Sequence, residues 1–447
     1  MFQKFDVLLP SFAEHVYNIV DFGAVGDGKT SNTKAFSEAM KAAAKTGGRV
    51  LVPNGIWLTG PIELLSGVEL HLSDNALILF DKNPEEYPLI ITDFEGVTRV
   101  RATSMLHARD AENIAITGNG TIDGNGHLWR PIKDWKMTER QWKALLEESS
   151  YVIPSRESNI WAPSETFYKG YMEGEVSPKD PQALEKAAPY YDFYRPVMVS
   201  LKNCDKVLID GVELRNSPAW NVHPHFCTNL TVRNATIFNP YHAQNGDGID
   251  VESCKNVEIH HCSFQTGDDG ICMKSGKNAE ARKITGPCEN VYIHHCTVGN
   301  SHGGFVVGSE MSRGVRNVLV EDCTFINADV GIRFKSAMGR GGVVEDICMK
   351  RVNMVDIKEE AVVFTMDYVL DTLGKQEGAV ESGLDEDVPE FKNIHLEDCV
   401  CVGAEIGLRI KGMQWKTPTI HDISIIHCNF LAKKPDELVN CENITIE

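Results

Sequence analysis

Four short motifs of acidic, imidazole and basic side chains lie in the second half of the chain. They are residues 245–250 (NGDGID), 267–270 (GDDG), 301–304 (SHGG) and 333–335 (RFK). Carboxylates transfer protons and cations bind anionic groups, so these residue types suit acid–base hydrolysis of an acidic substrate. Counted from Asp247, the successive steps to the aspartate pair, the histidine and the arginine are 21, 34 and 31 residues. If each step is one repeat, the four motifs share one face of the fold.

Asp247, Asp268 and Asp269 are the candidate catalytic residues. In a regular strand Asp268 and Asp269 would point to opposite faces, and one would enter the apolar core, which is strongly unfavourable for a carboxylate. The flanking glycines at 267 and 270 therefore predict a local distortion that turns both side chains outward. Crowded carboxylates repel one another, so we expect at least one to keep its proton to higher pH, as a general acid must. The neighbouring candidates for substrate binding are Asn245, Asp250, His302, Arg333 and Lys335.

Glycine-flanked acidic turns also occur in solenoids as plain turns or as calcium sites. For any one of these motifs that explanation would suffice. Four motifs in register, with a histidine and two cations beside the acids, favour a catalytic cluster instead. We predict neither a metal nor another cofactor.

A recurring phrase predicts the fold that would bring these motifs together. From about residue 199 onward, an Asn or Asp precedes an alternating β-branched run, a polar pair and an apolar residue, as in residues 255–264 (KNVEIHHCSF) and 289–298 (ENVYIHHCTV). The steps between equivalent positions are 23, 27, 34 and 27 residues, long enough for a coil of three short strands. Stacked coils bury their inward residues in ladders. The equivalent positions are Val207, Leu230, Val257, Val291 and Val318.

Cysteines recur at one position of the phrase, which indicates a buried ladder of small apolar side chains. The two His-His-Cys triplets that begin at His260 and His294 could suggest metal ligands. Adjacent strand residues face opposite ways, however, and the spacing matches no usual zinc pattern. The chain has 13 cysteines, an odd number, and a solenoid needs no disulfides, so we expect free thiols. The ladder positions are Cys262, Cys296, Cys323, Cys399 and Cys428.

Residues 1–447 are expected to form a single domain with few departures from the repeat. Apolar residues at helical spacing predict a helix over residues 33–44 that caps the open end of the solenoid. Residues 127–195 are rich in Trp and Tyr and contain a helix N-terminal capping box, Thr138-x-x-Gln141, so we expect an insertion that forms part of the cleft wall. A second loop, residues 371–390, is acidic and rich in glycine.

Residues 23–30 (GAVGDGKT) have the spacing of a nucleotide-binding phosphate loop. Such a loop should be followed by alternating strands and helices and a magnesium-binding Asp. Short strands follow here instead. We interpret the segment as a glycine-rich turn that leads into the cap helix.

The overall charge restricts the partners of the protein. The chain has 44 basic and 63 acidic side chains, and its net charge of −19 argues against general binding to nucleic acid or to anionic membranes. An acidic substrate would need a local basic patch. The first residues contain no apolar run long enough for a signal peptide and no segment suits a membrane span, so we expect a cytoplasmic protein.

The four motifs, together with residues 21–36 (DFGAVGDGKTSNTKAF), resemble the polygalacturonase family of pectin-degrading glycoside hydrolases. The family's Asn-Thr-Asp, Asp-Asp, Gly-His-Gly and Arg-Ile-Lys patterns appear here with Gly246, Ser301 and Phe334 as departures at spacer positions. The resemblance covers most of the chain apart from residues 127–195 and 371–390. It implies an all-β fold, a single-stranded right-handed parallel β-helix. A later segment, residues 407–411 (GLRIK), resembles the last pattern again and is interpreted as a possible outlying subsite.

The resemblance also implies a mechanism for hydrolysis of α-1,4 bonds between galacturonic acid residues. Asp268 protonates the leaving oxygen, and Asp247 and Asp269 activate the water that inverts the anomeric carbon. Arg333 and Lys335 pair with the uronate carboxylate, and His302 hydrogen-bonds within the cluster. An aromatic wall from residues 127–195 would close one end of the groove and make the enzyme exo-acting on short oligogalacturonides.

Other functions stay open at this point. A rhamnogalacturonan or xylogalacturonan hydrolase would keep the mechanism and change the subsites. A pectate lyase, also a β-solenoid, would eliminate with calcium and a base, giving an unsaturated product. A non-catalytic polysaccharide-binding solenoid would tolerate loss of the three aspartates, and an NTPase would need Lys29 for nucleotide binding.

Overall fold

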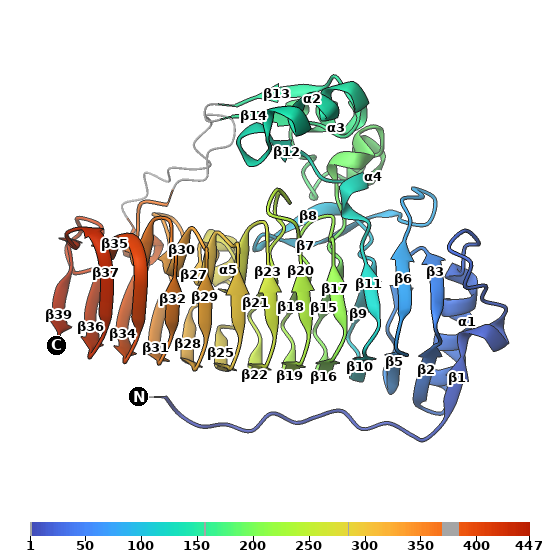
Figure 1. Ribbon diagram of the computed structural model, residues 1–447, viewed down its shortest axis with the longest axis horizontal. Helices are drawn as coiled ribbons and strands as arrows, with labels where there is room; N and C mark the ends of the chain where they lie inside the picture. Colours follow the sequence, from blue (N-terminus) through green and yellow to red (C-terminus); the bar gives the residue numbers. More distant parts are fainter. Residues whose placement is uncertain (1, 156–157, 285, 369–383) are drawn as a thin grey trace.

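The computed structural model describes residues 2–155, 158–284, 286–368 and 384–447, which form an elongated stack of parallel coils (Figure 1). Two sheets of 13 and 21 strands run the length of the described residues, and the pairings within both are parallel. The predicted parallel β-helix is therefore confirmed. None of the described helices is long and apolar enough to cross a membrane.

The register of the 13-stranded sheet follows the repeat residue by residue. Val207 pairs with Leu230, Leu230 with Val257, Val257 with Val291 and Val291 with Val318. These five side chains are at most 2% exposed, because they point into the coil and pack against the coils on either side. The strands that carry them are β16 (Asp205–Asp210), β19 (Thr228–Arg233), β22 (Lys255–His260), β25 (Cys288–His294) and β28 (Val315–Glu321).

Two residues in each repeat of the phrase have the left-handed backbone conformation, and both lie at its polar positions. The Asn before the β-branched run has a positive φ, as at Asn256 (57°) and Asn290 (57°), and so does the second residue of the polar pair, as at His261 (54°) and His295 (53°). Asn adopts this conformation at low cost because its short side chain can hydrogen-bond locally. The two bends bracket each strand of the 13-stranded sheet and turn the chain into the next strand.

The Asn side chains also form a ladder between coils. Asn290 Nδ2 donates to Asn256 Oδ1 at 2.9 Å, and Asn317 Nδ2 donates to Asn290 Oδ1 at 2.8 Å. We expect Asn290→Ala to lower the free energy of unfolding by about 1–3 kcal/mol, because it adds left-handed strain and removes two hydrogen bonds. Urea unfolding of this variant beside Asn290→Gly separates the two effects, since glycine removes the hydrogen bonds without the strain. Equal losses in both variants would show that strain contributes nothing.

The cysteine ladder is confirmed, but one expectation about the histidines is wrong. Cys262, Cys296 and Cys323 are buried with free thiols. His260 and His261 do not face opposite ways: their Nδ1 atoms lie 2.9 Å apart, because the left-handed bend at His261 turns both rings outward. Each ring stacks on its counterpart in the next coil, at 5.0 Å and 4.9 Å between centroids.

The cap helix and the glycine-rich turn before it agree with the sequence interpretation. Helix α1 (Thr33–Ala44) buries Phe36 and Met40 against β2 (Gly48–Val52) and the coil end. In the turn, the Asp27 carboxylate accepts the backbone N–H groups of Lys29 and Thr30 at 2.9 and 2.8 Å. These are amides that a phosphate loop would offer to a nucleotide.

The insertion rises above one side of the solenoid (Figure 1). It leaves after β11 (Thr121–Asp123) and returns before β15 (Val199–Lys202). Its predicted capping box lies at the start of α2 (Glu139–Glu148). Its other main elements are α3 (Glu165–Glu173), α4 (Ala183–Ala187) and a small sheet of β12 (Ile132–Lys133), β13 (Val152–Pro154) and β14 (Asn159–Trp161).

A hairpin that the sequence did not predict supports the insertion. It consists of β7 (Leu89–Phe94) and β8 (Val97–Ala102), and its Val100 is buried with Ala183 and Ala187 of α4. Of the acidic loop predicted over residues 371–390, residues 371–383 lie outside the described residues, and Asp385–Asp387 form a short 3-10 helix.

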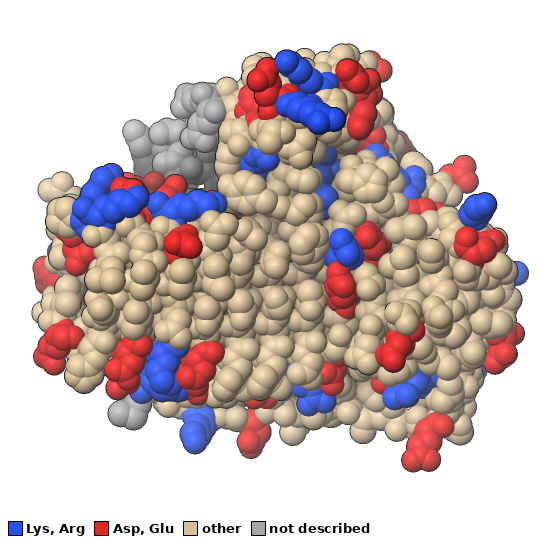
Figure 2. All heavy atoms as spheres, viewed as in Figure 1, with Lys and Arg blue, Asp and Glu red and all other residues tan. Residues whose placement is uncertain are grey.

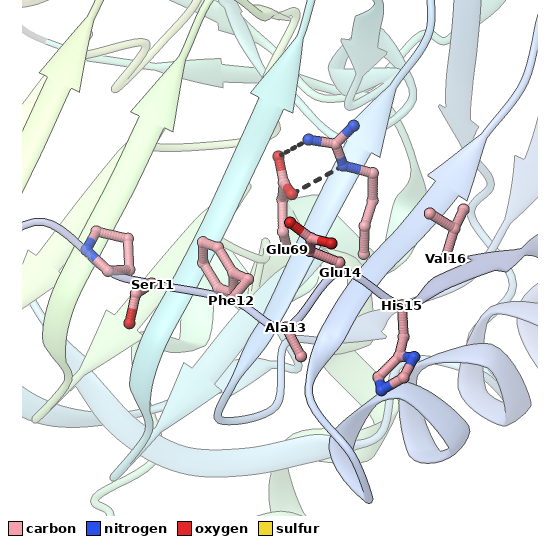
Figure 3. A pocket seen from close by; sticks show the side chains of 9 residues that line it. Ser11, Phe12, Ala13, Glu14, His15, Val16 and Glu69 are labelled. Atoms are coloured by element: carbon pink, nitrogen blue, oxygen red, sulfur yellow. Dashed lines mark hydrogen bonds and ion pairs between the residues drawn. The ribbon is translucent and has the colours of Figure 1, made fainter.

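The amino-terminal residues form an arm along the outside of the coils (Figure 1). The arm docks on the Asn ladder: the backbone of Gln3 donates to and accepts from the side chain of Asn317, and Leu8 N donates to Asn229 Oδ1. Figure 3 shows where the arm joins the first coil, beside the ion pair between Arg49 and Glu69. The arm thus adds cross-coil contacts on the side that carries the Asn ladder.

Candidate active site

The predicted motifs reach one face through four parallel strands of the 21-stranded sheet. Ile249 pairs with Ile271, and Asp269 pairs with Gly303, so the acidic motifs lie just before neighbouring strands. We call residues at equivalent positions of successive coils a row. Asp247 and Asp269 occupy the same row, and in the neighbouring row the His302 N–H donates to the carbonyl oxygen of Asp268. The strands are β21 (Ile249–Glu252), β24 (Asp269–Lys274), β27 (Gly303–Gly308) and β30 (Val330–Lys335).

Glycines in the row after these acids point into the core and force the acids outward. A Cβ on Gly270 would lie 2.4 Å from Cγ1 of Val298, and one on Gly304 would lie 2.5 Å from Cγ of Phe325. Both neighbours are fully buried core residues. Only glycine fits there, and the aspartates before it consequently face the groove. The predicted local distortion is confirmed.

The three candidate catalytic carboxylates come together. Each of Asp247, Asp268 and Asp269 has one oxygen within 4.8 Å of an oxygen of the other two. Asp247 and Asp269 are 3% and 1% exposed, whereas 22% of the Asp268 side chain is open to solvent. The most accessible of the three is therefore Asp268.

Cations and the histidine surround this cluster as expected, with one correction to their arrangement. Lys335 Nζ is 2.7 Å from Asp269 Oδ2, and His302 Nδ1 is 3.2 Å from Asp268 Oδ1. Arg333 shares the face but does not stack on His302. It pairs with Val306, farther along the strand, because the repeat spacing counts coils and does not fix the position within a coil.

Asn245 and Asp250 are occupied by protein contacts. Asn245 Oδ1 accepts from Nη2 of the buried Arg195 at 2.8 Å. Asp250 is fully buried, and its Oδ1 lies 3.6 Å from Lys274 Nζ, which also contacts Glu310 at 3.0 Å. Asn245 thereby holds the loop that leads to Asp247, whereas neither carboxylate oxygen of Asp250 has a hydrogen-bond partner among the described residues. Contact of either side chain with substrate stays a prediction.

The surroundings separate the proton affinities of the carboxylates. Burial, followed by repulsion from Asp250 and the catalytic pair, raises the pKa of Asp247 well above its usual value. Burial also opposes ionisation of Asp268, but His302, Lys136 and Lys335 outweigh it and lower the pKa of that carboxyl. The expectation that one acid keeps its proton is borne out in direction. The acid with the raised pKa is Asp247 rather than Asp268.

Comparison with known proteins identifies the family. A family model described as glycosyl hydrolases family 28 matches residues 191–385, and one described as rhamnogalacturonase A/epimerase, pectate lyase-like, matches residues 16–71. The chain is 29% identical to a probable polygalacturonase of Vitis vinifera, over 96% of this chain and 77% of the relative. It is 30% identical to an exo-poly-alpha-D-galacturonosidase of Dickeya chrysanthemi, over 79% of this chain and 57% of the relative.

A solved structure decides the assignment. The crystal structure of a hyperthermoactive exopolygalacturonase from Thermotoga maritima is 31% identical, with a TM-score of 0.73 over 99% of this chain and 94% of that chain. The chain belongs to glycosyl hydrolase family 28. It is a glycoside hydrolase, as the motifs predicted, and its parallel β-helix is shared with solved members of that class.

Sequence reasoning missed several residues of this family 28 site. Lys274 lies two coils from Lys335 in the same outward-facing row. Because alternate residues of a strand face the same side, the sequence could have predicted this position. Lys136 comes from the insertion, which carries no repeat and gave no signal. The hairpin residue Phe94 packs on Trp220, at 4.6 Å between centroids, and Trp220 lies in the row of Asp247, one coil earlier.

The second Arg-Ile-Lys pattern, residues 407–411, is in register with the first, but its two charges are paired with acidic side chains. Arg409 and Lys411 pair with Val363 and Thr365, which pair with Arg333 and Lys335, so the pattern lies two coils from the first. Arg409 is ion-paired with both Glu360 and Glu437, and Lys411 is ion-paired with Asp367. Its role as an outlying subsite stays a prediction.

The described residues also contain a buried group of His223, His225 and Glu252 whose ligand atoms lie close enough to hold a metal. His223 Nε2 is 2.8 Å from Glu252 Oε2, and Arg313 lies 3.9 Å from Glu252 Oε1. Burial opposes ionisation of Glu252, but the histidines and Arg313 lower its pKa to about 2. Arg313 supplies a positive charge to the carboxylate and His223 hydrogen-bonds to it, while burial lowers the pKa of His223, so we interpret the group as an internal polar network.

Proposed function

We propose that this glycoside hydrolase cleaves the α-1,4 bonds between galacturonic acid residues of polygalacturonate and its oligosaccharides, with inversion and from a chain end. The observation that carries the proposal is the set of three carboxylates within 4.8 Å of one another, beside buried cations. Carboxylates supply the acid and base of glycoside hydrolysis, and cations select a uronate over a neutral sugar. The names of the relatives, polygalacturonase and exopolygalacturonase, support the same substrate.

The positive charge is concentrated where this substrate would bind. On the flank shown in Figure 2 the charged side chains lie mostly near the edges, with both signs mixed. Arg333 and Lys335 lie under Tyr368, at 5.6 and 5.0 Å from the ring centroid, and Lys358 lies over Tyr241 at 4.7 Å. These three cations beside the catalytic carboxylates offer the local positive charge that a polyanionic substrate needs in a chain of net charge −19.

In this mechanism Asp268 is the acid and Asp247 and Asp269 hold the attacking water. The exposure of Asp268 supports its contact with the leaving oxygen. The histidine and the lysines around it lower its pKa, but a bound uronate would neutralise Arg333 and Lys335 and raise that pKa. Substrate binding would thereby move the proton to the carboxyl that must donate it.

Inversion rests on the family resemblance more than on the carboxylate spacing. Typical inverting sites separate the two carboxyl groups by about 6.5–9.5 Å, and retaining sites by about 5 Å. The oxygens here lie within 4.8 Å.

Exo action is supported by the insertion and the hairpin at one end of the groove. Lys136 of the insertion contacts His302, and Trp135 beside it is 51% exposed and packs edge-on to Tyr241 at 6.3 Å. A wall at this position would admit only a chain end.

The proposal also includes a cytoplasmic location, where short oligogalacturonides would be the substrate. The 13 free cysteines support this location, and cell fractionation would test it.

Digestion of defined oligogalacturonides tests reaction, stereochemistry and direction together. We expect stepwise release of a single short product from one end, a slow fall in the viscosity of polygalacturonate, and a β anomer as the first product by NMR. Rapid viscosity loss with random oligomers would contradict exo action. An unsaturated product that absorbs in the ultraviolet and disappears with a chelator would contradict hydrolysis.

A further inference from the structure

One lysine of the insertion reaches the catalytic loops. Lys136 ends the 3-10 helix η3 (Asp134–Lys136), and its Nζ donates to the carbonyl oxygens of Gly267 at 2.6 Å and Tyr241 at 3.0 Å. The third neighbour of Nζ is Nε2 of His302, at 3.1 Å. Gly267 precedes the aspartate pair, and Tyr241 belongs to the loop that leads to Asp247. A single ammonium therefore connects two catalytic loops and the histidine.

The same contact determines which nitrogen of His302 carries the proton. An ammonium has three donors and no acceptor, and the two carbonyls and Nε2 use all three. Nε2 must then accept, so the proton of the neutral ring lies on Nδ1. Nδ1 lies 3.2 Å from Asp268 Oδ1, its nearest carboxylate oxygen. A doubly protonated ring would place two cations 3.1 Å apart.

We propose that Lys136 is a positioning residue for hydrolysis: it fixes the Gly267 and Tyr241 loops and holds His302 as the tautomer that donates from Nδ1 to Asp268. This inference rests on the proposed function for its effect on turnover, but its structural part does not. It also gives the insertion a second role beside closing the groove, because the insertion supplies a contact on which the geometry of the acid depends.

The charges around Lys136 determine when this contact exists. Burial lowers the pKa of Lys136 to about 8, with Lys133 and Lys358 acting in the same direction and Asp268 and Asp329 opposing them. The remaining neighbours are the rings of Trp135, Tyr241 and His302. The ammonium is thus present below about pH 8. The Lys136 ammonium is also one of the cations that lower the pKa of Asp268.

Two variants separate the charge of Lys136 from its geometry, with trigalacturonate as substrate. Lys136→Met should lower kcat about 10- to 100-fold, because the acid is no longer held in place. It should also move the alkaline limb of the kcat profile, which reports the enzyme–substrate complex, to higher pH. Without the ammonium the pKa of Asp268 rises, and the acid stays protonated to higher pH. Lys136→Arg keeps the charge but not the three-way donor geometry, so kcat should fall while the limb stays in place.

The tautomer is measured without turnover, by ¹⁵N NMR of labelled histidine, with the His302 signals identified by their loss in His302→Gln. Wild type should show the proton on Nδ1, and Lys136→Met should lose this preference. The control Lys143→Met, an exposed lysine of α2 with 71% of its side chain open, should match wild type in every measurement. Absence of galacturonate release by wild type would refute the proposed function and leave the tautomer result standing.

Three results would overturn the inference. One is a wild-type His302 with its proton on Nε2. Another is a Lys136→Met variant with unchanged kcat and an unchanged alkaline limb. The third is an equal loss of kcat in the Met and Arg variants with both limbs in place, which would indicate only local damage to the fold.

Discussion

Asp268→Asn should reduce turnover of oligogalacturonides about 100- to 10,000-fold while the protein folds normally. A sugar hydroxyl is a poor leaving group, and loss of its general acid costs this much in rate. The side chain is 22% exposed and pairs with His302, and an amide of the same shape fits there without creating a buried charge. Circular dichroism and urea unfolding should match wild type.

A substrate with a good leaving group distinguishes the acid from the base. An aryl galacturonide loses a phenol that needs little protonation, so Asp268→Asn should regain much of its activity on it, whereas Asp247→Asn should not. The distinction matters because Asp247 has the raised pKa and Asp268 the lowered one. If Asp247→Asn instead regained activity on the aryl galacturonide, Asp247 would be the general acid and Asp268 would belong with the residues that activate water.

Lys335→Met should lower both the free energy of unfolding and kcat, and this is the second large effect that we expect. Lys335 and Asp269 are 5% and 1% exposed, and their atoms Nζ and Oδ2 lie 2.7 Å apart. Removal of the cation leaves a buried carboxylate without its partner, which costs about 3–5 kcal/mol in the free energy of unfolding. Loss of a charge that faces the reacting centre should lower kcat about 100- to 1,000-fold.

The chain provides a matched control for this prediction. Lys411 lies in the same row two coils away, but 52% of its side chain is exposed, and its pair with Asp367 is open to water. Lys411→Met should cost less than about 1 kcal/mol. The double variant Lys335→Met with Asp269→Asn should recover most of the stability and none of the activity. Equal stabilities for the two single lysine variants would contradict the buried-pair argument.

The sequence alone determined the register of the coils and the face that carries the acids. Each coil packs only on its neighbours, so the recurring pattern around inward residues such as Val257 and Val291 specifies their pairing directly. The Asn of each phrase adopts a positive φ for a local reason too, because its short side chain can hydrogen-bond locally, although the sequence analysis did not predict this bend. The cap helix and the capping box of α2 are likewise local signals, and both were predicted.

Only the tertiary structure decided which side chains complete the site and which carboxyl holds the proton. Lys136 and the hairpin residue Phe94 come from segments without a repeat, so no periodicity places them beside His302 or Trp220. The pKa order of Asp247 and Asp268 depends on burial and on cations that approach from other coils and from the insertion. Those quantities vary with distance in three dimensions, and spacing along a chain does not contain them.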